Sequence, residues 1–157
     1  MSTTFADYVD NKPAMDEQIS NIERYAVLLC DALYLDVKYE QLRYHNNAVD
    51  HVESDSFKGD KEYERNYHIN KIRDIDANGV DHEFYIESGR KYHKVIHKWK
   101  DNGSRSVHAF IDKKTGDVYK AASWKAPAKH VRFNLLDDNS REECLSRCDW
   151  AGGYLYM

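Results

Sequence analysis

Residues 119–129, YKAASWKAPAK, contain the residue types that bind anions. Lys120, Lys125 and Lys129 supply positive charge, and Ser123 supplies a hydroxyl. The alanines beside Ser123 would let backbone N–H groups approach a ligand, and Trp124 could stack on a base. We therefore predict a ligand site in this segment, completed by nearby arginines. The candidate residues are Arg105, Lys120, Ser123, Trp124, Lys125, Lys129 and Arg132.

The same segment also has a purely structural interpretation, in which Trp124 fills the core and the lysines point apart into solvent. The chain contains neither a GxxxxGK[ST] nor a GxGxxG phosphate-binding motif. Because side chains alternate along a strand, Lys120 and Ser123 can meet at one anion only if the strand ends or bulges near Ala122. The two interpretations therefore differ in the path of the chain after Lys120.

Charge is distributed very unevenly along the chain. Residues 90–132 contain twelve Lys and Arg against three Asp, a net charge of +9, whereas the whole chain carries −4. Everything outside this stretch therefore carries −13. A chain polarised in this way is expected to have a basic face, which favours an anionic partner.

Other constellations are weaker candidates for chemistry. His93, His97 and His108 could bind a metal, but no carboxylate or Cys stands at a supporting spacing, and Cys144 with Cys148 lacks a second pair. Ser123 with His108 or His130 could form a nucleophile and base, yet nothing orders them into a triad. We expect no metal, no cofactor and no catalytic residue, and an enzyme is the less favoured interpretation.

A helix is predicted over residues 13–45, after a short arm at residues 1–12. Pro13 suits a first helical position, and the helix would either continue to its end at Asn46-Asn47 or break near Asp36. A spacing of four and three residues places the apolar residues in one stripe. We expect this stripe to pack on the protein's own sheet, although a coiled-coil dimer would give the same spacing. The stripe consists of Met15, Ile19, Ile22, Ala26, Leu29 and Leu33.

Strands with glycine at the turns follow over residues 67–123. The predicted strands are residues 67–75, 80–87, 90–100, 107–111 and 117–122, which form an antiparallel meander. The first of them is the least distinct, because residues 61–75 could also be a helix. Asp112 and Asp117 flank a turn and are interpreted as turn formers.

The remainder, residues 124–157, is predicted to contain a loop, a helix and a tail. Residues 131–136 could add a last strand, and residues 150–156 a strand or packed tail. Ser140 and Glu143 form a capping-box pattern that would start a helix ending at Cys148. We therefore predict one α+β domain, residues 1–157: a long N-terminal helix on an antiparallel meander of about five strands, with a short C-terminal helix.

The apolar runs, the first residues and the cysteines indicate where in the cell the protein is located. The chain has no apolar run long enough to span a bilayer, and its first residues, MSTTFADYVDNK, lack the features of a secretory signal. Three cysteines, with Cys30 inside an apolar helical pattern, favour reduced thiols. These observations predict a cytosolic protein that does not act in a membrane.

The stretch from Gly103 to Arg132, with its core FIDKKTGDVYKAASWKAPAKHVR, resembles small uncharacterised proteins of tailed bacteriophages. Many of these proteins carry a similar TGD-VYKAASW-APAK run near the C-terminus. The resemblance covers about 30 residues and implies a location in the host cytoplasm, with the virion as the alternative. It implies no activity and no catalytic residue.

These observations favour non-catalytic binding of an anionic ligand, nucleic acid or a nucleotide, through a basic sheet face and the Lys-rich loop. The alternative is a protein–protein module, either a virion component or an inhibitor of a host protein. In that case the basic face would meet an acidic host or phage protein, or the acidic part of a second copy in a homo-oligomer.

Overall fold

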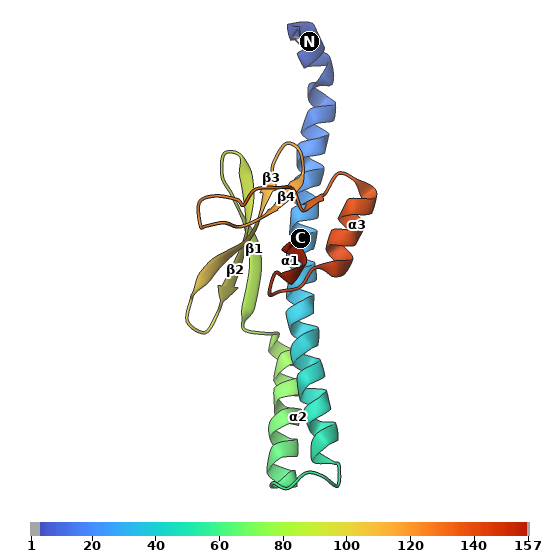
Figure 1. Ribbon diagram of the computed structural model, residues 1–157, viewed down its shortest axis with the longest axis vertical. Coiled ribbons are helices and arrows are strands. Elements are labelled where there is room, and N and C mark those ends of the chain that lie inside the picture. The colour runs from blue at the N-terminus through green and yellow to red at the C-terminus, as the bar shows by residue number, and fades with distance from the viewer. Residues whose placement is uncertain (1–3, 157) are drawn as a thin grey trace.

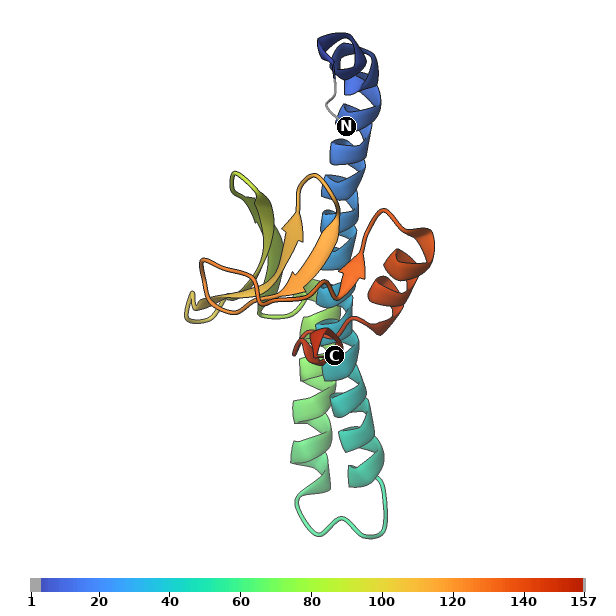
Figure 2. The same cartoon turned by 45° about the horizontal axis from the view of Figure 1, so that its top comes forward.

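The computed structural model of the protein describes residues 4–156. One long helix runs through the molecule, and the other elements are arranged beside it (Figure 1). This helix, α1, spans Phe5–Val52. The C-terminal half of α1 pairs with α2 (Lys61–Asn78) to form a helical hairpin (Figures 1 and 2). The sheet and α3 (Asp138–Arg147) pack beside the middle of α1. The N-terminal turns of α1 project beyond the sheet.

The helix α1 is longer at both ends than the predicted span of 13–45. Residues 1–3 of the predicted arm lie outside the described residues, and residues 5–12 are helical. Thr4 is the N-cap and forms a reciprocal capping box with Asp7, so Pro13 lies inside the helix and is not its first residue. Asn46 and Asn47 do not end the helix, because α2 packs against this part of α1.

Residues 67–75 are helical, so the predicted first strand is wrong and the helical alternative holds. Asp60 caps α2 by accepting a hydrogen bond from the Tyr63 N–H, and Gly79 ends it with a positive φ of 77°. His45 Nδ1 of α1 and His68 Nδ1 of α2 lie 2.9 Å apart between the two helices.

Five antiparallel strands form the sheet in the order β1-β2-β3-β4-β5. The strands are β1 (His82–Ser88), β2 (Tyr92–Trp99), β3 (Arg105–Asp112), β4 (Asp117–Lys120) and β5 (Phe133–Asn134). The predicted meander of about five strands is confirmed, with β5 in place of the strand expected at 67–75. The α+β class, the long N-terminal helix and the short C-terminal helix are confirmed as well.

The core lies between α1 and one face of the sheet. Ile22, Ala26, Leu29 and Leu33 of α1 are fully buried, which confirms that this part of the predicted stripe packs on the sheet. Met15, at the start of the stripe, is 45% exposed, because the N-terminal turns of α1 project beyond the sheet. Opposite them are the inward side chains of the central strands, including Val95, Ala109, Ile111 and Val118. On the other face of the sheet, Ile96 and Phe110 are also buried. Both faces of the central strands are therefore covered.

A β-bulge changes the direction of one side chain on β3. Val95 pairs with Ala109 but Ile96 pairs with Val107, so His108 is the extra residue of the pair. The bulge turns the His108 ring toward α1, where it contacts Phe84 and Tyr154.

The C-terminal segment is a packed tail that contains a 3₁₀ turn, Gly153–Leu155. The Trp150 N–H donates to Asp36 Oδ2 of α1 at 3.0 Å. The capping of α3 differs from the prediction, because Asp137 is the N-cap and accepts from the Ser140 N–H. Ser140 Oγ instead accepts from the Asn134 N–H and ties α3 to β5.

Candidate ligand-binding site

A cleft opens where β4 separates from β3. The two strands pair only from Ala109 to Ile111 on β3, and β4 ends at Lys120. The following chain folds back on itself, with a bridge between Ala121 and Pro127. Residues 105–107 of β3 and residues 121–124 therefore face each other across the cleft without strand pairing.

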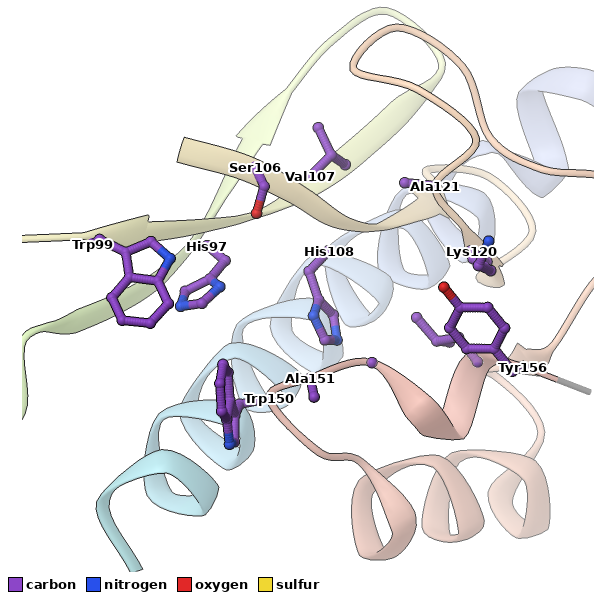
Figure 3. A pocket seen from close by; sticks show the side chains of 12 residues that line it. His97, Trp99, Ser106, Val107, His108, Lys120, Ala121, Trp150, Ala151 and Tyr156 are labelled. Atoms are coloured by element: carbon purple, nitrogen blue, oxygen red, sulfur yellow. The ribbon is translucent and has the colours of Figure 1, made fainter. Parts of the chain in front are cut away.

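The cleft has an inner hollow of about 390 Å³ on the side of the C-terminal turn (Figure 3). Its rings come from β2, from the β3 bulge and from the tail, and Lys120 contributes the cation. These side chains point toward one another in Figure 3. The principal side chains are His97, Trp99, His108, Lys120, Trp150 and Tyr156.

An outer hollow of about 360 Å³ lies on the opposite side of the same opening. Arg105, Ser123 and Trp124 contribute its polar and aromatic groups. Both hollows are bordered by Ser106, Val107 and Ala121, so they meet at the place where β3 and β4 part.

Cations lie against aromatic rings on both sides of the cleft. The Lys120 ammonium is 4.4 Å from the ring centre of Tyr156. On the outer side, Lys94 and Arg105 lie 5.0 and 5.2 Å from the ring centre of Trp124. Such contacts hold the cations next to flat apolar surfaces while leaving their charge available to a ligand.

Of these cations, Arg105 has an acidic neighbour. Its guanidinium donates to Glu87 Oε2 at 3.4 Å and to the Tyr85 hydroxyl at 3.1 Å. Within residues 4–156, no ion pair within 4 Å involves Lys94 or Lys120. These two lysines are therefore the uncompensated charges at the cleft.

The histidines of the inner hollow are neutral at pH 7. Burial, together with a smaller effect of the neighbouring His82, lowers the pKa of His97 to about 4. Burial also lowers the pKa of His108 to about 4. His82 Nδ1 lies 2.8 Å from His97 Nε2, and His108 Nε2 lies 2.8 Å from the Tyr154 hydroxyl. The hollow thus offers neutral rings, and its formal positive charge comes from Lys120.

The three histidines considered as metal ligands do not converge. His93 is buried beside Ser88, with 2.6 Å between Nδ1 and Oγ. His97 and His108 are held by His82 and Tyr154. Among residues 4–156, no cluster of three or more His, Cys, Asp or Glu is placed to hold a metal ion.

The serine considered as a nucleophile has no base beside it. Ser123 Oγ accepts a hydrogen bond from the Lys125 N–H at 3.3 Å. Across the part of the chain that the structure describes, no hydrogen bond joins Ser123 to His108 or His130.

The structure separates the predicted site residues into four groups, the last of which is Arg132 alone. Arg105, Ser123 and Trp124 line the outer hollow, whereas Lys120 lines the inner one. Lys125 and Lys129 are exposed and line neither hollow. Trp124 is 38% exposed, so it does not fill the core.

Arg132 belongs to the internal framework. Its Nε donates to the Leu155 carbonyl at 2.7 Å, and Nη1 donates to the carbonyls of Lys129 and His130. The backbone amides expected to meet a ligand are also engaged, because the Ala122 and Ser123 N–H groups donate to the Ala126 carbonyl.

Several residues of the inner hollow are absent from the predicted set. Trp150 and Tyr156 reach the cleft from the C-terminal tail, and Trp99 reaches it from β2. The local signal at Lys120 could not reveal them, because they are distant in sequence. The high tyrosine and tryptophan content was the only available indication.

The fold and cleft define a class of α+β proteins with a long helix behind a five-stranded antiparallel meander. Residues 5–157 match the family of unknown function DUF7717, and the chain therefore belongs to this family. No curated protein and no solved structure matches the chain. Among the helices within residues 4–156, none has the length and apolar character needed to cross a membrane.

Proposed function

We propose that this protein binds single-stranded nucleic acid or a nucleotide at the cleft between β3 and the 121–124 loop, without catalysing a reaction. The observation that carries the proposal is the pairing of cations with exposed rings on both sides of one opening. Lys120 lies over Tyr156 inside, and Lys94 and Arg105 lie over Trp124 outside.

Nucleotides combine a flat ring with a phosphate, and the cleft offers a partner for each. A base can stack on Trp124 or on the rings of the inner hollow, since stacking accepts any base. Lys120 and Lys94 can then approach the phosphates as point charges. The absence of a fixed phosphate loop suits a ligand that is recognised by stacking and charge.

The charge of residues 90–132 supports the same ligand class. This stretch carries +9 within a chain of −4, so the sheet and its loops attract polyanions while the helical remainder repels them. Such a field speeds encounter and orients the ligand toward the sheet.

Fluorescence anisotropy with a labelled single-stranded oligonucleotide tests the proposal. Binding should weaken steeply as salt rises, because phosphate neutralisation releases counterions. Lys120→Ala should weaken binding at least tenfold at low salt and reduce the slope of log K against log salt by about 0.7. No binding at low salt, or binding insensitive to salt, would overturn the proposal.

A second variant separates stacking from charge. Trp124→Ala should weaken binding by about 1–3 kcal/mol and leave the salt slope unchanged, since a stacked base contributes no counterion release. The matched control is Lys58→Ala, which removes an exposed lysine in the α1–α2 loop. If Lys58→Ala weakened binding as much as Lys120→Ala, the ligand would not be at the cleft.

A further inference from the structure

A second apolar stripe runs along α1 on the side opposite the core. It repeats with spacings of four and three residues, as the core stripe does, but faces outward. Leu28, Leu35 and Tyr39 within it are 48%, 42% and 56% exposed. The outward stripe consists of Leu28, Ala32, Leu35 and Tyr39, and it ends there because Leu42, the next position on the line, packs against the core.

The neighbouring elements leave this side of α1 open. The sheet, α2 and α3 contact other sides of the helix (Figures 1 and 2). Tyr25 precedes Leu28 on the same line, but its ring lies under the Arg141 guanidinium of α3, 4.2 Å from it. Around Leu28 the surface is hollowed, with Ser20, Arg24 and Val27 at its border.

The spacing is that of a coiled-coil seam. Alternating four- and three-residue steps place every member of the outward stripe at an a or d position. From Leu28 to Tyr39 the seam extends along about 18 Å of helix. A single exposed leucine needs no explanation, but a contiguous stripe of exposed apolar side chains marks an interaction surface.

We propose that the partner is a second copy of this chain, whose α1 packs antiparallel against the outward stripe. If Ala32 faces Leu35 of the second copy, Leu28 faces Tyr39. The small Ala32 side chain then meets a large one in each half of the seam. Shifting the second helix by one heptad would instead place Leu28 against Asn46.

Charge at the edges of the seam favours the same orientation. Asp31 and Lys38 flank the stripe at g positions, and the antiparallel alignment places each of them beside the other in the second copy. A parallel arrangement would place Asp31 beside Asp36 and Lys38 beside Arg43, which are like-charged pairs. Two attractive pairs therefore accompany the antiparallel dimer.

Sedimentation equilibrium of the full chain tests the proposal. The wild-type protein should be a dimer at tens of micromolar, and Leu35→Glu should weaken dimerisation at least tenfold with unchanged circular dichroism. The control Tyr63→Glu alters an exposed ring of α2, 66% exposed, and should remain dimeric. A monomeric wild-type protein, or a Leu35→Glu dimer of wild-type affinity, would overturn the proposal.

Charge exchange tests the orientation. Asp31→Lys or Lys38→Asp alone should weaken the antiparallel dimer, and the double variant should restore it, because each new lysine again meets an aspartate. In a parallel dimer Asp31→Lys would strengthen association by pairing with Asp36. A stronger Asp31→Lys dimer would therefore refute the antiparallel arrangement.

Discussion

His108 and Tyr154, 46 residues apart in sequence, face each other with 2.8 Å between the imidazole Nε2 and the phenol oxygen. Their rings are stacked with centres 5.6 Å apart. Burial raises the pKa of Tyr154 well above its ordinary value and lowers that of His108 to about 4. The pair is therefore neutral at pH 7, and it fastens the C-terminal turn to the bulge of β3.

Acid should destabilise this protein within a defined pH range. The pKa values of His97 and His108 fall from 6.5 to about 4 on folding, so the unfolded chain binds more protons between these limits. The free energy of unfolding should therefore decrease as pH falls from 6.5 towards 4 and be constant with respect to these groups above 6.5. Thermal melts at half-unit steps of pH measure this dependence.

Carboxylates also titrate at the acidic end of this range, so a matched pair of variants isolates the histidines. His108→Asn should flatten the decline between pH 6.5 and 5, because it removes one group with a lowered pKa. His51→Gln alters an exposed histidine on α1 and should leave the decline unchanged. Equal slopes in both variants would assign the acid sensitivity to other groups.

Two adjacent leucines of α1 should respond very differently to truncation. Leu29 is fully buried under the sheet, and Leu29→Ala should lower the free energy of unfolding by about 2–5 kcal/mol. Leu28→Ala, at a 48% exposed position, should change the stability of the monomer by about 0.5 kcal/mol or less. Urea unfolding under dilute, monomeric conditions provides the comparison. Similar losses would contradict the assigned helix face.

Two turn glycines have the same backbone conformation but different surroundings. Gly103 and Gly116 have φ values of 71° and 79°. A methyl group on Gly103 meets no atom within 4 Å, whereas on Gly116 it would lie 3.2 Å from Leu136 Cγ and 3.4 Å from Ile22 Cγ1. Gly103→Ala should cost about 1 kcal/mol through backbone strain, and Gly116→Ala clearly more. Melting temperatures of the two variants, measured side by side, test this difference, and equal losses would show that the contacts at Gly116 add no cost.

Two cations of the predicted site should differ in their effect on stability. Arg132 donates to the Leu155, Lys129 and His130 carbonyls, so Arg132→Ala should destabilise the fold by about 1–3 kcal/mol. Lys129→Ala removes an exposed side chain and should leave the melting temperature nearly unchanged. An Arg132→Ala variant with wild-type stability would return this arginine to the list of free binding residues.

The elements that local patterns define were predictable. The buried stripe of α1 and the glycine turns gave the helix, the strands β1 to β4 and the α+β class. The error at residues 67–75 has a physical cause, because the apolar residues Tyr67, Ile69, Ile72 and Ile75 are spaced by two and three residues, and so short a pattern is compatible with either element. Packing against α1 and the Asp60 cap decide for a helix there.

The cleft was predictable only on one side. Lys120, Ser123 and Trp124 lie close in sequence, and the end of β4 at Lys120 is the break that a shared anion site requires. No spacing rule could add Trp150 and Tyr156, because only tertiary packing brings the tail to β3. Arg132 was predicted to bind a ligand because a sequence does not show which backbone carbonyls an arginine contacts, and here those carbonyls belong to the protein itself.

The hydrogen bond from Trp150 to Asp36, across 114 positions, has a consequence for the order in which the molecule forms. The helical hairpin and the meander join neighbours in sequence, so both can form early while the chain emerges from the ribosome. The inner hollow requires Trp150 and Tyr156, which are made after the hairpin and the meander. A chain cut before residue 149 would therefore keep most of its secondary structure and lack one wall of the cleft.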